Sequence, residues 1–362
     1  MRIAQISPLF ESVPPRLYGG TERIVADLTK ALVALGQEVT VFASRDSQIP
    51  EGAHFVPAEH KALRLSGCRD PIPPHLLMFE HVRKLQDQFD IIHFHTEYLH
   101  LPLARTLETP AVSTLHGRLD LRDYPEIFGE FSELPQVSIS FNQRKPLPHA
   151  NWAGMVHHGI DASHLPFHEK GSGYLAFLGR LTPEKGFERA VEIARRTGKV
   201  LKVAAKIEPD LYPEYVEQVA PLLNEPFVEY IGEIGDDKKA EFLGNADATL
   251  FPVQWPEPFG LVMIESLATG TPLIAFRRGS VPEIVKPGET GFIVENVDEA
   301  CKAVASLSSI DRRNCRKDFD NRFTPERMAK DYLKIYQQIC HGKRHRRVRP
   351  KVLTAETARG LI

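Results

Sequence analysis

Cysteine is scarce in this sequence, and long hydrophobic runs are absent. The four cysteines lack the CxxC spacing of a zinc or redox site, so we expect reduced, structural thiols and neither a disulfide framework nor a zinc site. No apolar run approaches the roughly 18 residues that a membrane span needs. The opening residues MRIAQIS are typical of a strand and lack the basic, then apolar pattern of a secretory signal. A cytoplasmic location is therefore the default expectation.

A surplus of charge is also missing. The net charge of -2 over 362 residues gives no global attraction to nucleic acid or membrane, and we expect no nucleic-acid partner. The length suffices for two domains, each with its own core. One local exception is the segment 343–351, which contains six Lys or Arg residues and no acid. Such a run predicts a flexible, basic tail at 342–362. Contact with a membrane through this tail is the less favoured alternative.

The glycine fingerprint of nicotinamide dehydrogenases, GxGxxG directly after a strand, is missing as well. Residues 2–6 and 38–43 are short apolar runs typical of strands. Apolar residues at helical spacing between them predict a βαβ unit whose helix has Thr21 as its N-cap. Gly19 and Gly20 stand immediately before that helix, where their backbone amides either face a ligand or form a plain turn.

What is present is a series of short apolar runs separated by helical patterns. This alternation predicts an α/β protein with parallel sheets, doubly wound by helices on both faces. A polar stretch with glycine and proline, residues 165–173, interrupts the series and marks a linker. We expect domains at 1–165 and 166–323, followed by a helix at 324–341. The other predicted strands cover residues 91–94, 111–115, 137–139, 154–156, 174–178, 201–205, 228–231, 248–251 and 271–275.

The stretch from 255 to 269, WPEPFGLVMIESLAT, combines several signals of an anion site. Pro258 suits the first position of a helix, because its ring fixes a helical φ and it has no N–H to leave unpaired. The amides of Phe259, Gly260 and Leu261 would then point outward at the positive end of the helix dipole. Gly260 also lets an anion approach the backbone closely. The stretch therefore predicts a phosphate-binding helix start.

Two acids, Glu257 and Glu265, belong to the same stretch. Glu265 shares a helix face with apolar neighbours three and four residues away, so it interrupts an apolar stripe. A carboxylate in that position is costly unless a partner satisfies it. The hydroxyls of a sugar or a ribose would do so, and so would a core arginine.

With seven residues between these acids, P-E-P-F-G-L-V-x-I-E resembles the E-x(7)-E signature of the retaining glycosyltransferases of family 4. The sequence G-R-L-T-P-E-K-G at 179–186 is similar to that family's diphosphate-binding pair, and G-x-x-P-E follows at 279–283 as it does in the family. The sequence AAKIEP departs from the Gly-x-Gly often found at its position. The variants LYGGTE and FRRGSVPE resemble a bacterial subgroup that includes antibiotic-decorating transferases.

The resemblance implies a GT-B fold, in which two Rossmann-like domains face a central cleft and the last helix crosses back to the first domain. It also implies a retaining, metal-independent transferase that takes a nucleotide-diphosphate sugar as donor and a small molecule or glycan as acceptor, with no further cofactor. The residues implied to be catalytic are His116, Arg180, Lys185 and Glu257. Those implied to bind the donor are Gly19, Gly20, Lys206, Phe259, Gly260, Leu261 and Glu265.

Each implied role has a physical basis and a simpler alternative. Arg180 and Lys185 are expected to hold the diphosphate, because cations stabilise the charge that develops on that leaving group. The resemblance implies that Glu257 orients sugar hydroxyls, that Glu265 accepts from the ribose and that His116 contacts the sugar. The simpler alternatives are surface salt bridges for the cations and a hydrogen-bonded structural role for the histidine.

A metal site is not expected. The D-x-D of metal-dependent transferases occurs only at Asp318-Phe319-Asp320, which has no strand before it. His93 and His95 share one side of a strand but have no acidic partner at suitable spacing. Other activities on the same fold are a nucleotide-sugar epimerase, a phosphorylase and a non-catalytic nucleotide-sugar-binding protein. The sequence does not identify the sugar, the base or the acceptor.

Overall fold

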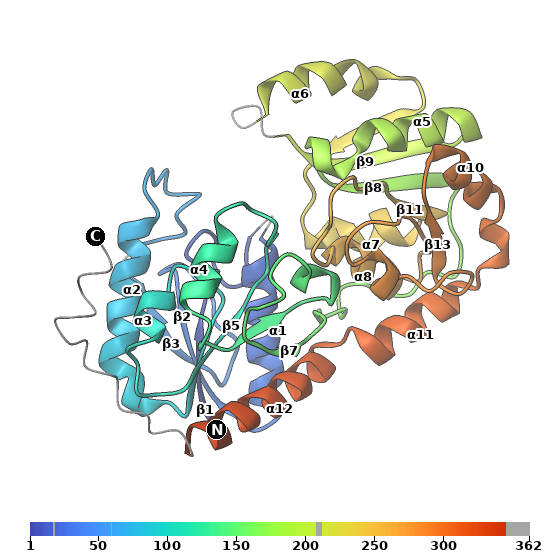
Figure 1. Ribbon diagram of the computed structural model, residues 1–362. Coiled ribbons are helices and arrows are strands. Elements are labelled where there is room, and N and C mark those ends of the chain that lie inside the picture. The colour runs from blue at the N-terminus through green and yellow to red at the C-terminus, as the bar shows by residue number, and fades with distance from the viewer. Residues whose placement is uncertain (17–18, 59, 208–211, 345–362) are drawn as a thin grey trace.

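The computed structural model describes residues 1–16, 19–58, 60–207 and 212–344. Within these residues the chain builds two parallel sheets, and helices cover each of them (Figure 1). The predicted α/β class with two Rossmann-like domains is confirmed. Most of the predicted basic tail, and the end of the segment AAKIEP, lie outside the described residues.

The first sheet has seven parallel strands in the order β3-β2-β1-β4-β5-β6-β7. They are β1 Arg2–Ile6, β2 Glu38–Ala43, β3 His54–Pro57, β4 Ile91–Phe94, β5 Ala111–Thr114, β6 Gln136–Ser138 and β7 Trp152–Met155. The helices of this part are α1 Gly20–Ala34, α2 Ile72–Leu85, α3 Leu101–Ala104 and α4 Tyr124–Glu130, with 3₁₀ turns at Gln86–Gln88 and Asn142–Arg144.

The second sheet has six parallel strands in the order β10-β9-β8-β11-β12-β13. They are β8 Tyr174–Arg180, β9 Val200–Lys206, β10 Val228–Gly232, β11 Ala248–Phe251, β12 Leu273–Phe276 and β13 Gly291–Val294. The helices are α5 Phe187–Thr197, α6 Pro213–Val219, α7 Asp236–Gly244, α8 Leu261–Ala268, α9 Val281–Ile284, α10 Val297–Ala305 and α11 Arg312–Arg322, with 3₁₀ turns at Pro183–Lys185, Ala220–Asn224 and Leu307–Ser309.

The last described helix, α12 Pro325–Arg344, returns to the first sheet. Figure 1 shows it running along the first domain beside α1. Because side chains alternate across a strand, the two faces of β1 meet different helices. Ile3 belongs to the core shared with α1 and α12, whereas Ile6 belongs to the core shared with α2. Tyr332 and Tyr336 of α12 are fully buried there.

The strands predicted at 2–6, 38–43, 91–94 and 248–251 have the predicted bounds. They are mainly apolar runs near the centres of the two sheets, for which the sequence signal is strongest. The edge strands β3 and β13 were not predicted. Strand β3 has no buried side chain and ends in proline, and β13 begins at a glycine, so neither shows the pattern of a buried strand.

Two predicted helix starts are wrong. Thr21 is not an N-cap, because α1 begins at Gly20 and the extended residue before it, Gly19, occupies the cap position. Pro258 does not open a helix either. Helix α8 begins at Leu261, and the left-handed backbone of Gly260, with φ of 80°, separates it from the proline.

Candidate active site

A cavity of about 230 Å³ lies between the two domains. Residues at the carboxyl ends of β5, β8, β9 and β11 line it, as expected for ligand sites in open parallel sheets. The lining contains all seven residues implied to bind the donor, together with His116, Lys185 and Glu257. Arg180 is the exception: it does not line the cavity, and its guanidinium donates to Glu184 at 3.3 Å.

The backbone between Glu257 and α8 is held with its carbonyls turned into the protein. The carbonyls of residues 257–259 accept, in that order, from Ser280 N at 2.9 Å, Ser140 Oγ at 2.7 Å and Ser280 Oγ at 2.8 Å. The described hydrogen bonds of the chain give no acceptor to the amides of residues 260–262. These amides, at the positive end of α8, are available to an anion.

Gly260 is required at this turn for two reasons. Its left-handed backbone is one that other residues rarely adopt. In addition, a Cβ atom at this position would lie 2.8 Å from the ring of Phe251. The predicted anion site is therefore built by a glycine turn in front of the helix and not by a proline at its first position.

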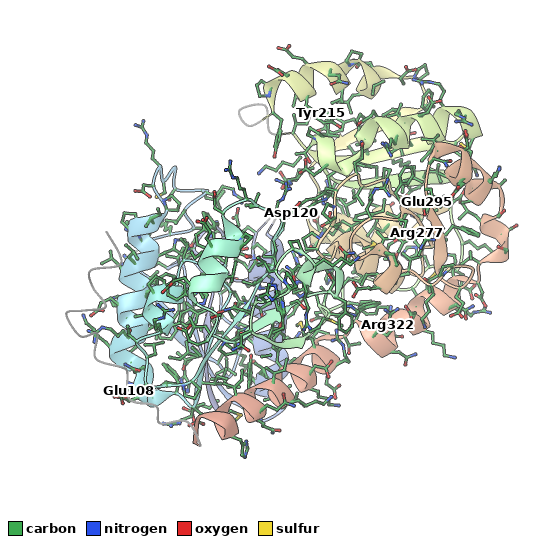
Figure 2. The ribbon with its side chains drawn as sticks, viewed as in Figure 1. Glu108, Asp120, Tyr215, Arg277, Glu295 and Arg322 are labelled. Atoms are coloured by element: carbon green, nitrogen blue, oxygen red, sulfur yellow. The ribbon has the colours of Figure 1, made fainter. Side chains whose placement is uncertain are left out.

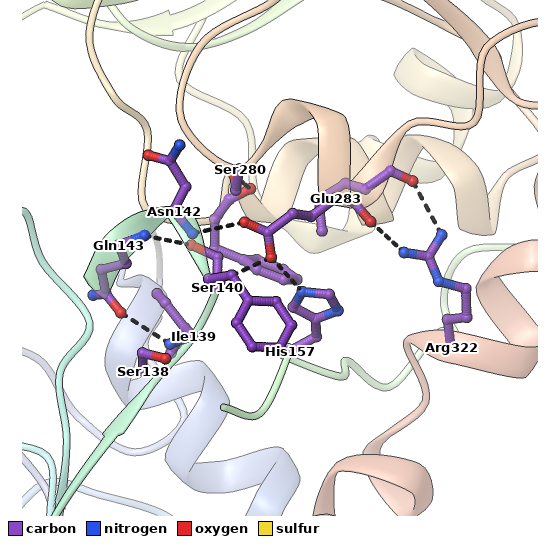
Figure 3. Close-up of polar contacts among 12 residues, drawn as sticks. Ser138, Ile139, Ser140, Asn142, Gln143, His157, Ser280, Glu283 and Arg322 are labelled. Atoms are coloured by element: carbon purple, nitrogen blue, oxygen red, sulfur yellow. Dashed lines mark hydrogen bonds and ion pairs between the residues drawn. The ribbon is translucent and has the colours of Figure 1, made fainter. Parts of the chain in front are cut away.

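Glu283 fastens this region to the first domain (Figure 3). Its carboxylate accepts from the backbone amides of Phe141 and Asn142, both at 2.8 Å, and lies 3.2 Å from His157 Nε2. These partners hold the pKa of Glu283 below its usual value despite the opposing effect of burial. Arg322 in turn donates to the backbone carbonyls of Glu283 and Ile284. The serine and glutamate contacts join the second-domain side of the cavity to the end of the first sheet.

Both acids of the E-x(7)-E pattern are buried beside a lysine. Glu257 is 7% exposed, and its Oε2 accepts from Lys185 Nζ at 2.5 Å and from Trp255 Nε1 at 2.9 Å. Glu265 is 4% exposed, and its Oε1 accepts from Lys239 Nζ at 2.7 Å. The partner of Glu265 is thus a lysine that itself lines the cavity, and not the core arginine considered above.

Lys239 continues into an ion-pair chain that crosses the cleft. Its Nζ lies 3.3 Å from Asp236 Oδ1, and Asp236 Oδ2 lies 2.5 Å from Arg23 Nη1. Arg23 belongs to α1 of the first domain, whereas Asp236 and Lys239 belong to α7 of the second. Lys239 and Arg23 were not predicted from the sequence. Their partners, Glu265 and Asp236, lie 26 and 213 positions away in the chain, and no local sequence pattern links residues so far apart.

His116 follows β5 and joins a cluster of imidazoles. Its Nε2 lies 2.9 Å from His95 Nδ1, and its ring stacks on His158 with centroids 5.2 Å apart. Burial lowers the pKa of His116 to about 3, so the ring is neutral at physiological pH. His158 also lines the cavity. It was missed because the sequence HHG beyond β7 suggests only a loop.

Glu97 holds the turn that carries His116. Its Oε1 accepts from His116 N at 2.9 Å and from Gly117 N at 3.0 Å. Its backbone is left-handed, with φ of 50°, which is uncommon outside glycine and marks a position that the surroundings determine. Burial raises the pKa of Glu97 to about 7.

Gly19, just before α1, is closely packed at the other side of the cavity, because an added Cβ would lie 2.7 Å from Pro15. Gly20, the first residue of α1, faces Leu261 of the second domain, and an added Cβ there would lie at an ordinary contact distance of 3.5 Å. Glu22 in the first turn of α1 accepts from the amide of Glu11 at 3.2 Å, and burial raises its pKa to about 7.

The segment 119–126 begins beside the cleft. Asp120 lies on the side of the first domain that faces the second (Figure 2). Its carboxylate pairs with Arg118 at 2.7 Å, and the Arg118 guanidinium lies 5.5 Å from the ring centroid of Trp255.

The described part of the chain contains no group of three or more His, Cys, Asp or Glu residues arranged to hold a metal ion. His93 bonds to Tyr336 and Thr114, and so both its nitrogens are engaged. Asp318 and Asp320 lie within α11 and pair with neighbouring Lys and Arg side chains. A search of the same described residues found no helix with the length and hydrophobicity of a membrane span.

Two family models match the chain in succession. Residues 18–161 match Glycosyltransferase Family 4, and residues 165–322 match Glycosyl transferases group 1. Among curated relatives, a glycogen synthase of Mycobacterium tuberculosis is 25% identical, with 95% of this chain and 96% of the relative aligned. A phosphatidyl-myo-inositol mannosyltransferase of Mycobacterium leprae is 26% identical over 85% of this chain and 87% of the relative.

Solved structures share the fold over the same extent. AviGT4, a glycosyltransferase involved in avilamycin A biosynthesis, superposes with a TM-score of 0.74 at 23% identity, covering 94% of this chain and 98% of that one. HepE of Anabaena, solved in complex with UDP and glucose, superposes with a TM-score of 0.69 at 17% identity, covering 96% of this chain and 100% of that one.

Proposed function

Since the chain belongs to the family 4 glycosyltransferases of the GT-B fold, which use nucleotide sugars, we propose that it is a retaining, metal-independent transferase. It moves a sugar from a nucleotide-diphosphate sugar to a small-molecule or glycan acceptor. The observation that carries this proposal is the cavity between the domains. It combines a helix start whose amides have no acceptor among the described residues, a partly buried lysine and two buried acids.

The diphosphate occupies the start of α8 in this proposal. The amides of residues 260–262 and Lys185 contact its oxygens, and Arg180 supplies a second cation when it exchanges Glu184 for phosphate. As the bond between the anomeric carbon and the phosphate oxygen breaks, charge develops on the diphosphate, and these groups stabilise it. The acceptor oxygen bonds to the same face of the sugar, and its proton passes to the departing phosphate.

The acids and the histidine orient the rest of the donor. Glu257 is held by Lys185 close to the diphosphate site and accepts hydrogen bonds from sugar hydroxyls. Glu265 accepts from the ribose hydroxyls, in exchange for or together with its bond to Lys239. His116 contacts the sugar from the first domain. Lys206, at the end of β9, contacts the nucleotide.

The first test is thermal stabilisation of the purified protein by a panel of UDP-, GDP-, dTDP- and ADP-sugars without added metal. We expect a shift with one nucleotide. UDP heads the panel because a structural relative, HepE, is solved with UDP-glucose. Absence of any shift in a protein that melts cooperatively would argue against a formed donor site.

An acceptor screen then separates the activities. Release of nucleoside diphosphate only when an acceptor is present indicates transfer, and proton NMR of the product shows whether the anomeric configuration is retained. Inversion of a sugar carbon without acceptor would indicate an epimerase, and phosphate-dependent breakdown of an oligosaccharide would indicate a phosphorylase. Loss of activity in EDTA with recovery in manganese would contradict metal independence.

A further inference from the structure

A chain of hydrogen bonds leads from His116 through the first sheet to α12. His116 Nε2 lies 2.9 Å from His95 Nδ1, and His95 Nε2 lies 2.7 Å from Gln5 Oε1. The other end of the Gln5 amide, Nε2, donates to the hydroxyl of Tyr336 at 3.2 Å. Gln5, His95 and Tyr336 are each 0% exposed. Water therefore does not compete for these bonds.

The direction of each bond follows from the chemistry of its atoms. An amide oxygen only accepts, so His95 Nε2 must donate to Gln5 Oε1. A neutral imidazole carries a single N–H, and burial keeps the pKa of His95 well below its usual value. His95 Nδ1 is therefore the acceptor, and the hydrogen between the two rings belongs to His116 Nε2. Because His116 is neutral as well, its Nδ1 carries only a lone pair.

That lone pair has no hydrogen-bond partner among the residues that the structure describes. His116 Nδ1 is buried and makes no hydrogen bond to any described residue. A buried acceptor without a partner costs free energy, and such an atom calls for an explanation. The His116 ring lines the cavity. A bound donor sugar would supply the missing hydrogen from a hydroxyl or an amide.

From this arrangement we propose that Gln5 is a positioning residue: through His95 it holds His116 as the tautomer protonated at Nε2, so that Nδ1 accepts a hydrogen bond from the sugar. The assignment of the sugar as the partner rests on the proposed function, whereas the tautomer does not. In this state His116 binds a hydroxyl and donates no proton to the leaving group.

The orientation of the Gln5 amide decides which nitrogen of His116 carries the hydrogen. If the amide were reversed, its NH₂ group would donate to His95 Nε2, His95 Nδ1 would carry the hydrogen, and His116 Nδ1 would become a donor. The structure places the NH₂ group against Tyr336, whose hydroxyl also lies 2.7 Å from His93 Nδ1. Gln5 and Tyr336 thus act together, although Tyr336 comes from the far end of the described chain.

The test is the tautomer of His116, read from long-range nitrogen–proton correlations in ¹⁵N-histidine-labelled protein without substrate. The His116 signals are assigned by their loss in His116→Asn. We expect Nε2 protonated and Nδ1 bare in more than about nine-tenths of the wild-type molecules, which corresponds to a bias of roughly 1.4 kcal/mol. If His116 of the wild type is protonated at Nδ1, that spectrum alone overturns the proposal, and no variant is needed.

Substitutions at Gln5 then test the cause. Gln5→Leu removes the acceptor for His95 Nε2, so a second His116 form with hydrogen on Nδ1 should become detectable. Gln5→Glu keeps an acceptor-only oxygen and should preserve the wild-type form. The control is Tyr332→Phe, which removes an equally buried hydroxyl that bonds to Thr114 and is connected to Gln5 only through Thr114, His93 and Tyr336. Its spectrum should match the wild type.

The outcomes separate the two proposals. An unchanged tautomer in a folded Gln5→Leu, or an equal change in Tyr332→Phe, would assign Gln5 a merely structural role. If the tautomer behaves as expected and no transferase activity is found, the proposed function fails and the role of Gln5 stands. If transfer is found and His116 carries hydrogen on Nδ1, the role of Gln5 fails alone.

Discussion

At the scale of single residues, the cations near the proposed diphosphate site differ in how firmly they are held. Lys185 is paired with a buried carboxylate at 2.5 Å, whereas Arg180 makes a longer, half-buried contact of 3.3 Å with Glu184. Removing one partner of a buried pair leaves an uncompensated charge, and removing a partly exposed arginine does not. Arg180 is therefore the better position at which to test charge stabilisation without damaging the fold.

We expect Arg180→Ala to lower kcat by roughly 10²–10³, the scale of losing one preorganised stabiliser of developing charge. The melting temperature should stay near that of the wild type. Steady-state kinetics of nucleoside diphosphate release measures the effect. Arg195→Ala, which removes an exposed arginine paired with Glu192 and Glu225, is the matched control and should leave kcat unchanged. Near-normal turnover of Arg180→Ala would remove this residue from the mechanism.

Glu97 predicts a pH-dependent stability. Burial raises its pKa from 4.5 to about 7, so the folded protein binds more protons than the unfolded chain between these values. The contribution of this group to stability is therefore complete below about pH 4.5 and is lost as the pH rises through about 7.

Glu97→Gln removes this titration while keeping an oxygen that accepts from the amides of His116 and Gly117. Relative to the wild type, its free energy of unfolding should rise by up to roughly 3 kcal/mol between pH 4.5 and pH 8, at about 1.4 kcal/mol per pKa unit. Urea unfolding of both proteins at several pH values measures the difference. A difference that does not vary with pH would show that Glu97 is ionised in both states.

Residues of the site were predictable where a local pattern carries the chemistry. Glu257, Glu265 and the amides near Gly260 follow from one stretch of sequence, and the structure brings them to one cavity. Arg23, His158 and Lys239 were not predictable, because their roles depend on partners from distant elements. Gly260 was expected to let a ligand approach the backbone closely, and that stays a prediction; its left-handed backbone was not predicted.

At the scale of elements, the turn before α8 determines where the helix amides point. An alanine at position 260 meets both an unfavourable backbone conformation and the Phe251 ring. An alanine at position 288, where φ is 77° and no atom lies within 4 Å of the added Cβ, would meet only the unfavourable backbone conformation. The two substitutions therefore separate backbone strain from steric overlap.

Gly288→Ala should lower the free energy of unfolding by roughly 1–2 kcal/mol, the cost of a left-handed residue with a Cβ atom. Gly260→Ala should cost more, because the Phe251 ring must move. By displacing the helix start it should also weaken binding of whichever nucleotide stabilises the wild type in the thermal panel. Calorimetric titration with that nucleotide and urea unfolding of both variants check this. Equal losses in the two variants would contradict a role for the Phe251 contact.

The elements themselves were predicted best where they are most buried. Central strands such as β1 and β4 are short, mainly apolar runs that are almost wholly buried, and this pattern favours a strand. The edge strand β3 forms because β2 offers it hydrogen-bonding partners, which its own sequence does not reveal. Helix α1 begins where the Gly19 backbone becomes extended, and packing of that glycine against Pro15 decides this more than the Thr21 side chain does.

At the scale of the whole molecule, several polar contacts join the two domains. Among them are the Arg23–Asp236 pair and the Glu283 carboxylate on the amides of Phe141 and Asn142. Both contacts link a residue of the first domain to a residue of the second. We expect the separation of the domains to depend on them.

Glu283→Ala leaves two backbone amides without their acceptor, at a cost of roughly 1–3 kcal/mol each. The melting temperature should fall, and small-angle X-ray scattering should show a larger radius of gyration because the domains open. The exposed Glu289 on the same domain supplies the control substitution, Glu289→Ala, which should change neither quantity. A stable Glu283→Ala protein with an unchanged radius would show that the other contacts suffice.

Helix α12 also has a consequence for how the protein is made. Tyr336 completes the core around Gln5, yet 331 positions separate the two residues in the chain. At a synthesis rate of 5–20 residues per second, roughly 15–70 s pass between their emergence from the ribosome. Throughout that interval the apolar surface that α12 later covers is open to chaperones and to other nascent chains. The first domain to be translated is thus among the last parts of this molecule to be finished.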